Sequence, residues 1–465
     1  MDVQTAEGVT INQFAYNSQE TLPSRYMKHQ EVYLYPTQQN AIVSTSSNRV
    51  IRFLVGPNGF LDSKSSVFAL NAQITGLMDT DKAWFTDDTD TWVSRCTILT
   101  NQGVTVDETR SANVLAGMIR REVEPSYEQS VGRASLNMLQ SAGTNAYTSP
   151  TIPVGMNAAD RTARGVANLR YIIELKQCGF LADALNFWPL KSMASQNSNS
   201  LQIELEFAPV SQMVVSNNGL SGEDFGPAVG NIQYNLSNIV YIQNLIFDDL
   251  KEVQLSEVVH TTPIVLAYKT HRNYDSIIPA GTASTIQIAE FQENMIQLDN
   301  CIILSDNISN PTTDMTYYSN PPLTQYQLQV GTTYFPAQPV LLNTSTGAVS
   351  NAEQYYNYAI TQQKQKKTFM GFYPISFTAG SPTTTESNQN QDFILSIDLR
   401  VAPDDSVGDP MYNQFFAGIN CKNNPQPLQL KTNYSSVSEN QYTMYSFTTY
   451  VANLIIQANE TYVIS

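Results

Sequence analysis

Two β-strand patterns, at residues 169–175 and 201–207, are joined by a compact aromatic and proline connection. The first is an apolar run of the kind that fills a buried strand. The second, LQIELEF, alternates apolar and polar residues without a break, as a strand with one buried face does. The connection between them carries Phe180 and the tripeptide Trp188-Pro189-Leu190. This arrangement predicts an all-β domain.

Length and composition predict a chain with large cores. The chain has 465 residues, which at about 150 residues per domain gives two or three domains. Hydrophobic residues make up 42% of it and charged residues only 14%. Disordered chains combine high net charge with few aromatic residues, so this chain is expected to fold. Its uncharged polar residues are more typical of extracellular or virion β-proteins than of cytosolic enzymes.

Further strand patterns recur along both halves of the chain, separated by turn-forming residues. They span residues 49–55, 67–74, 92–99, 239–247, 263–268, 285–289, 295–304, 393–401 and 442–457. Two helices are expected as insertions, at residues 111–121 after a cap at Ser111 and at residues 351–365. The long stretches 103–165 and 310–385 are expected to be loops that carry function.

The best candidate for an interdomain connection is residues 216–230, where four glycines occur with Asn, Ser and Pro. The predicted organisation is an N-terminal arm at residues 1–30, a first β-domain at 31–215, a linker at 216–232 and a second β-domain at 233–465.

A weak internal repeat is compatible with two related halves. Segments 201–209 and 395–403 share five of nine residues, and both alternate. Because β-strands converge on such patterns easily, true repetition and convergence are equal alternatives.

The net charge of −16 argues against nucleic-acid binding by this chain. Neutralising phosphates requires clustered Lys and Arg, whereas acidic residues outnumber basic ones by 41 to 25. The basic cluster at residues 364–367 is interpreted as a solvated helix end rather than a nucleic-acid contact.

The cysteines and the N-terminus point to a reducing compartment. Cys96, Cys178, Cys301 and Cys421 form no C-x-x-C pair, so they are expected to be reduced and buried rather than bound to zinc or in a disulfide framework. The N-terminus lacks the pattern of a signal peptide, and no run reaches the roughly 18 apolar residues of a membrane span. We therefore expect synthesis in a cytosolic compartment and no transmembrane segment.

The sequence lacks the motifs of common enzyme classes. His29, His260 and His271 have no metal-binding spacing, and no phosphate-binding glycine loop or nucleophile elbow occurs. We predict no enzymatic activity, no catalytic, cofactor-binding or metal-binding residues, and no cofactor. The paired carboxylates of a glycosidase stay open, because their spacing is spatial rather than sequential.

One acidic stretch leaves calcium binding open. Asp79, Asp81, Asp87, Asp88 and Asp90 could place several carboxylates around one ion, but the stretch lacks the turn glycine and terminal Glu of an EF-hand. A solvated loop between strands is the preferred interpretation.

Tyrosine-rich stretches at residues 355–358 and 442–447 pose a similar choice. They could form sugar-binding platforms, but tyrosine also suits packed surfaces, and both stretches fall in predicted regular structure. Packing is the preferred interpretation.

The stretch from Phe180 to Phe207, set in two balanced β halves, resembles the double jelly-roll major capsid proteins, in particular those of polinton-like viruses and virophages. The resemblance implies two consecutive eight-stranded jelly-roll β-sandwiches with short helices in loops. It also implies homotrimers that form pseudo-hexameric capsomers and tile the icosahedral capsid of a DNA virus. Penton and minor capsid or cement proteins are further implied partners. The implied location is the virion, after synthesis in the host cytosol.

The same resemblance places residues 1–30 at the base of the capsomer, and residues 310–350 and 351–365 outward or towards a sister subunit. The main alternative is a secreted or surface carbohydrate-binding β-sandwich protein, which would also be acidic and rich in Tyr and Asn. A third class, an enzyme on a β-scaffold, lacks an anchoring motif.

Overall fold

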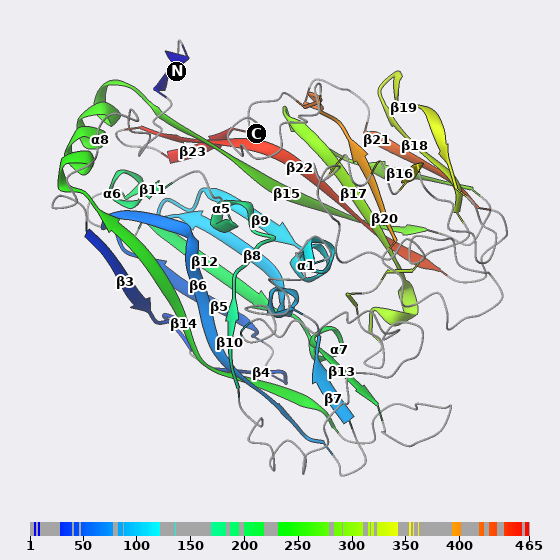
Figure 1. The fold of residues 1–465 in the computed structure, drawn as a ribbon, viewed down its shortest axis with the longest axis horizontal. Coiled ribbons are helices and arrows are strands. Elements are labelled where there is room, and N and C mark those ends of the chain that lie inside the picture. Colours follow the sequence, from blue (N-terminus) through cyan, green and yellow to red (C-terminus); the bar gives the residue numbers. More distant parts are fainter. Residues whose placement is uncertain are drawn as a thin grey trace.

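The computed structural model describes residues 28–120, 169–217, 231–342, 393–400, 418–434 and 441–464, each range with short gaps except the fourth and the last two with one gap each, together with a few isolated positions. Among these residues β-strands predominate, and they form two sandwiches side by side (Figure 1).

Each sheet of the first sandwich is antiparallel. One sheet has the order β10 (Leu169–Ile173), β6 (Phe60–Thr75), β14 (Gln233–Phe247) and β3 (Lys28–Leu34). Two short strands extend it: β11 (Trp188–Pro189) pairs with β6, and β4 (Ile42–Val43) pairs with β14. The other sheet has the order β5 (Val50–Val55), β12 (Leu201–Phe207), β8 (Val93–Thr100) and β9 (Thr105–Arg110).

The second sandwich repeats this order. Its first sheet contains β20 (Ile394–Asp398), β17 (Met295–Leu304), β22 (Tyr442–Ile456) and β15 (Ile264–Ile278). Its second sheet contains β16 (Ala283–Ile288), β21 (Leu428–Tyr434), β18 (Leu323–Val330) and β19 (Thr333–Leu341). The short strand β23 (Thr461–Ile464) pairs with β22.

Both sandwiches therefore have one topology. Numbered along the chain, the eight main strands of each sandwich form sheets in the orders 6-3-8-1 and 2-7-4-5. Two four-stranded antiparallel sheets linked in this crossed way are a jelly roll, which hides most of its strand edges. The predicted fold class, two consecutive eight-stranded jelly rolls, is confirmed.

The alternating strand predicted at residues 201–207 is the central strand β12. Its burial alternates at every residue, with Leu201, Ile203, Leu205 and Phe207 fully buried. It lies between β5 and β8, so both of its edges are hydrogen-bonded. Burying side chains of this size is worth about 1.5–3 kcal/mol each, which explains why this pattern was the strongest local signal.

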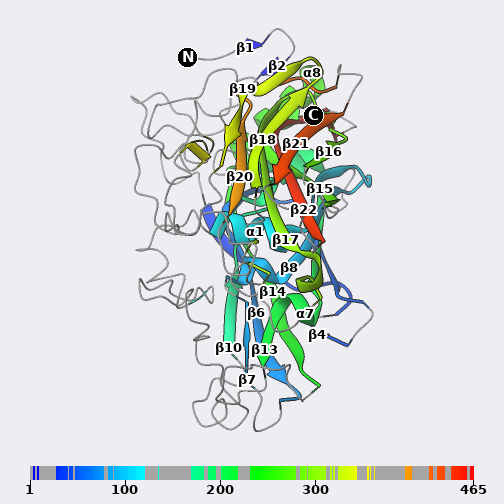
Figure 2. The same cartoon turned by 90° about the vertical axis from the view of Figure 1, so that its right-hand side faces the viewer.

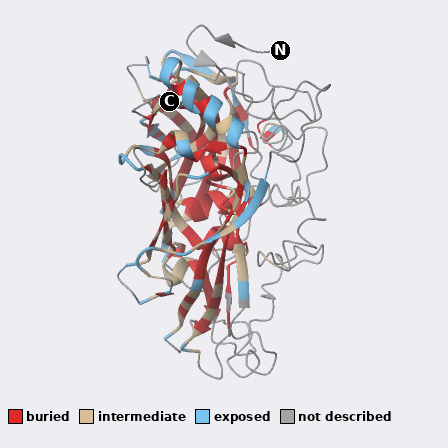
Figure 3. Cartoon of the chain, turned by 90° about the vertical axis from the view of Figure 1, so that its left-hand side faces the viewer, coloured by how far each residue is buried: buried red, intermediate tan, exposed pale blue. Residues whose placement is uncertain are grey.

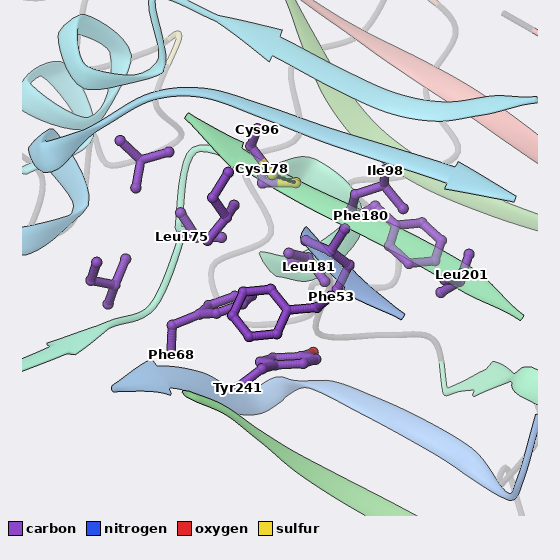
Figure 4. Packing of buried hydrophobic residues seen from close by; sticks show 14 of the residues in the cluster. Phe53, Phe68, Cys96, Ile98, Leu175, Cys178, Phe180, Leu181, Leu201 and Tyr241 are labelled. Atoms are coloured by element: carbon purple, nitrogen blue, oxygen red, sulfur yellow. Dashed lines mark hydrogen bonds between the residues drawn. The ribbon is translucent and has the colours of Figure 1, made fainter. Parts of the chain in front are cut away.

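Aromatic rings fill the first core (Figure 4). Phe68 stacks on Tyr241 with ring centroids 4.3 Å apart, and Phe53 packs on Phe68 at 5.3 Å. Phe180 stacks on Trp188 at 3.9 Å. The predicted connection between β10 and β12 thus contributes its aromatic residues to the core, through the short helices α5 (Gly179–Ala182) and α6 (Leu190–Met193).

The expected domain boundary at residue 233 is corrected by the pairing of β14. This strand pairs with β6 on one edge and with β3 and β4 on the other, so it is the eighth strand of the first sandwich. The second sandwich begins only after helix α8 (Asp249–Thr261), which starts at an N-cap in which Asp248 accepts a hydrogen bond from the Lys251 N–H. The glycine-rich composition at 216–230 marked a break between strands, not between domains.

The apparent internal repeat joins strands that are not equivalent. Residues 201–207 form the seventh strand of the first sandwich, whereas β20 is the sixth strand of the second. The true counterpart of β12 is β21. The similarity of the two segments therefore reflects convergence on a half-buried strand pattern.

The helix expected at residues 111–121 is α1 (Ala112–Arg120). Ser111 begins it through its carbonyl, which accepts from Val114 and Leu115 N–H groups. The expected side-chain cap is replaced by a contact with the second sandwich, because the Ser111 hydroxyl accepts a hydrogen bond from Asn273 at 2.8 Å.

Several other predicted segments are described only in part. At residues 351–365 the described positions are Glu353, Gln354, Asn357 and Thr361, all helical. Of the predicted arm, two short strands are described, β1 (Gln4–Thr5) and β2 (Gly8–Val9), and β2 pairs with β15. The loop predicted at 310–385 contains β18 and β19, and the loop predicted at 103–165 contains β9 and α1, so neither is structureless throughout.

Candidate assembly surfaces

The two sandwiches meet where β9 of the first lies against β15 of the second. The Tyr268 hydroxyl donates a hydrogen bond of 2.6 Å to the Val106 carbonyl, and the Thr270 hydroxyl donates one of 2.5 Å to the Asp107 carboxylate. We call this junction of β9 and β15 the seam. All four residues are buried, so the seam is a permanent interface rather than a loose contact.

Asp107 is the polar centre of the seam. Besides Thr270, its carboxylate accepts from the Phe180 backbone N–H at 2.9 Å and from the Cys178 thiol at 3.4 Å. Burial raises the pKa of Asp107, and the hydrogen bonds from Thr270, Phe180 and Cys178 oppose that rise. A buried carboxyl group that is satisfied on this many sides fixes the relative position of the elements that supply the donors.

The Cys178 thiol also contacts Cys96, with 3.4 Å between the sulfur atoms (Figure 4). All four cysteines are buried free thiols, as the sequence predicted. Burial raises the pKa of Cys178 well above its usual value. The thiol is therefore a hydrogen-bonding core group rather than a nucleophile.

Backbone also packs closely at the seam. A Cβ atom on Gly179 would lie 1.8 Å from the Lys269 carbonyl oxygen. Phe180 and Trp188 both meet the Tyr268 ring edge-on, at centroid distances of 5.7 Å. Only glycine at position 179 lets α5 approach β15 closely enough for these ring contacts.

Each sandwich contributes residues to the core of the other. In α1, Val114, Leu115 and Met118 belong to the second core, and the Tyr318 hydroxyl donates to the Val114 carbonyl at 2.9 Å. In the opposite direction, Ile264 of β15 and Leu454 of β22 belong to the first core. The two sandwiches are thereby held as one body.

The acidic stretch is not a solvated loop at Asp88 and Asp90, which are both buried. Asp90 accepts hydrogen bonds from the backbone N–H groups of Glu174, Leu175 and Lys176 at 2.8–3.1 Å. This corrects the preferred interpretation for these two residues: Asp90 is a structural acceptor that holds the turn after β10. Asp79, Asp81 and Asp87 lie outside the described residues.

A cation already sits beside this pair. The Lys176 ammonium lies 3.9 Å from Asp88, 3.8 Å from Asp90 and 2.9 Å from Glu174. Burial raises the pKa of Asp88 to about 7. Within the described part of the chain no group of three or more His, Cys, Asp or Glu side chains is placed to hold a metal ion.

The other residues singled out in the sequence have structural surroundings. His271 lies in β15 with its Nδ1 3.0 Å from the Thr449 hydroxyl, whereas His29 and His260 are exposed. In the stretch 442–447, Tyr442, Met444 and Phe447 are buried in the second core, so packing is the role shown there. Residues 355–356 and 358, and the basic cluster at 364–367, lie outside the described residues.

Sequence reasoning missed the residues that join the sandwiches, Asp107 and Thr270. Each stands in a segment with an alternating pattern, TVDETR or IVLAYKT, but neither pattern tells which strand lies opposite. A buried acidic residue in an otherwise β-branched strand was the available signal.

Exposed aromatic and aliphatic side chains gather on two edge strands and one helix. Tyr33 lies on β3 and Tyr35 just after it, and Tyr334 and Leu341 lie on β19. On α8, Leu250 and Val253 are exposed. Figure 3 looks onto the side with α8 and β3, where exposed residues are frequent, and Figure 2 looks onto the opposite side, which carries β19. No helix in the described part of the chain is long and apolar enough to cross a membrane.

No protein-family model and no curated protein sequence matches this chain. Solved structures share its fold over nearly the whole length. The Faustovirus major capsid protein covers 95% of this chain and 92% of its own chain, with 10% identity and a TM-score of 0.55.

A chain of the Sputnik virophage structure covers 99% of this chain and 93% of its own, with 14% identity and a TM-score of 0.55. A chain of the PBCV-1 virus capsid covers 97% and 100%, with 11% identity and a TM-score of 0.54. At these identities the likeness concerns the fold. The chain thus has the double jelly-roll fold that is found in the major capsid protein of Faustovirus.

Proposed function

We propose that this chain is a viral major capsid protein, whose homotrimers form pseudo-hexameric capsomers that tile the icosahedral capsid of a DNA virus. The observation that carries the proposal is the repetition of one eight-stranded topology within one chain. Two similar sandwiches in a rigid body supply two similar tiles. Three such chains supply six tiles, which suits a position of near sixfold symmetry.

The seam supports this role because it holds the two sandwiches in one relative position. Asp107, Thr270 and Gly179 fix the contact, and α1 inserts into the second core. A shell requires tiles of constant shape, since an error in the angle between sandwiches would accumulate over many copies.

The chemistry of the described residues supports a structural role rather than an enzymatic one. The buried carboxyl groups of Asp90 and Asp107 are held by backbone and hydroxyl donors, and burial raises the pKa of Cys178. We infer no cofactor. The net charge of −16 supports the view that another component contacts the genome. Penton and minor capsid or cement proteins are the proposed further partners, and the virion is the proposed location.

A carbohydrate-binding sandwich is the alternative class. The aromatic residues that would form its platform at 442–447 are largely buried, so no described observation favours it. The proposed order of the chain is an arm, a first jelly roll that ends with β14, a connection through α8 and a second jelly roll.

Light scattering after size-exclusion chromatography, with negative-stain images of the same peak, tests the proposal. We expect a mass of three times 51.7 kDa and particles of hexagonal outline. A protein that stays monomeric at every concentration, and that binds specific sugars on a glycan array, would replace this proposal with the carbohydrate-binding class.

A further inference from the structure

The seam shows how one sandwich of this fold covers the next. It packs β9, the fifth strand of the first sandwich, against β15, the first strand of the second. On β9, Val106 and Asp107 are only 4% and 3% exposed, and on β15, Tyr268 and Thr270 are 0% and 1% exposed. The contact therefore buries the middle of both strands.

The equivalent strands at the two ends of the chain have no such cover among the described residues. The fifth strand of the second sandwich is β19, where Tyr334 is 39% and Leu341 68% exposed. The first strand of the first sandwich is β3, where Tyr33 is 53% exposed, and Tyr35 beyond it is 65% exposed. The first four residues of β3 are all exposed, whereas Ile264 and Leu266 at the start of β15 are buried.

The two uncovered strands lie on opposite sides of the molecule. In Figure 1, β3 is at the left and β19 at the right. Each is also the edge strand of its sheet in the described part of the chain. Two different surfaces on opposite sides can only join copies head to tail, and a head-to-tail contact makes a ring when its rotation closes.

The side chains on β19 favour packing over strand addition. Pro336 and Pro339 lie within this strand and have no N–H to donate to another strand. Contact must then be made through side chains, as it is at the seam. Tyrosine is enriched in such interfaces because it combines apolar area with a polar hydroxyl.

We propose that β19 of one copy packs against β3 of the next copy, so that the contact between chains repeats the seam within the chain. This inference rests on the proposed function and names the surfaces that build the trimer. Each chain then contributes one internal seam and half of each of two external ones. Three copies close a ring of six sandwiches.

Paired glutamate substitutions test the two surfaces separately. One variant carries Tyr33→Glu and Tyr35→Glu, and the other carries Tyr334→Glu and Leu341→Glu. The matched control carries Leu250→Glu and Val253→Glu on α8, whose side chains are 63% and 51% exposed but lie on neither strand. Circular dichroism and thermal unfolding verify that each variant folds like the wild type.

We expect each strand variant to fall from three times 51.7 kDa to 51.7 kDa, while the α8 control stays trimeric. Mixing the two strand variants gives a sharper result. Each retains the surface that the other lacks, so they should form a complex of twice 51.7 kDa and stop there. A contact between identical surfaces would instead leave one variant trimeric and would give no mixed dimer.

The outcomes separate this inference from the proposed function. If the wild type is a trimer and both folded strand variants remain trimers, the inference is overturned and the capsid proposal stands. A wild type that is monomeric at every concentration overturns both.

Discussion

Thr270 of the second sandwich donates its hydroxyl to the buried Asp107 carboxylate of the first, with 2.5 Å between the oxygen atoms. This is a hydrogen bond to an acidic group in a place without water contact, where a lost donor is costly. It makes the stability of the two sandwiches interdependent.

Thr270→Val removes the donor and keeps the shape of the side chain. We expect a loss of about 1.5–3 kcal/mol in the free energy of unfolding, the usual range for a hydrogen bond to a charged group. Urea unfolding measures it. Thr105→Val, at an exposed position of β9, is the control and should change little. Equal effects of the two substitutions would show that the Asp107 contact is not stabilising.

Gly179→Ala tests the close approach of α5 to β15. The added Cβ would lie 1.8 Å from the Lys269 carbonyl, so backbone has to move and the ring contacts of Tyr268 are lost. Overpacking of this kind costs typically 1–3 kcal/mol, and occasionally more. Gly56→Ala is the control because nothing lies within 4 Å of its Cβ position. Thermal unfolding of both variants decides, and an unchanged midpoint for Gly179→Ala would contradict the seam geometry.

Asp88→Asn should remove one source of pH dependence. Burial raises the pKa of Asp88 to about 7 from 3.8, so the folded state holds this proton more tightly than the unfolded state does. Its contribution to stability is present at low pH and is lost as the pH rises from 3.8 to about 7. Asn keeps the acceptor for the Asp90 N–H and tolerates the positive φ of 65°.

The measurement for Asp88 is the difference in unfolding free energy between wild type and variant at a series of pH values. We expect the wild type to lose stability relative to the variant across that window. A difference that does not vary with pH would mean that Asp88 keeps an ordinary pKa.

His271→Asn should act in the opposite direction. Burial lowers the pKa of His271 to about 4 from 6.5, with Lys269 nearby adding to the effect. The unfolded state therefore binds this proton more tightly, and stability is lost as the pH falls from 6.5 to about 4. The variant should lack this acid-side loss. Nuclear magnetic resonance titration of the imidazole provides an independent check, and a midpoint near 6.5 would contradict the prediction.

The strands with a strong local pattern were predictable from the sequence. The bounds expected for β17, residues 295–304, agree with the structure, and β12 agrees to the residue. Their apolar residues face cores that lie within their own sandwich. The residue pattern alone is then enough, because burial on one face dictates alternation.

The strands that were missed depend on partners far away in the chain. β19 contains Pro336 and Pro339, which read as loop, and β9 contains the acidic residues Asp107 and Glu108. Asp107 is buried only because β15, some 160 residues later, supplies Thr270. No local pattern contains that information, and the same reason placed the domain boundary before β14 instead of after it.

The exchange of residues between the cores has a consequence for synthesis on the ribosome. Ala452, Leu454 and Ile456 complete the first core, although its earliest strand begins at Lys28. A nascent chain cannot close its first sandwich until almost the whole polypeptide has emerged. Chains that stop early keep apolar surface open and are presented to chaperones and proteases, so only finished molecules join a growing particle.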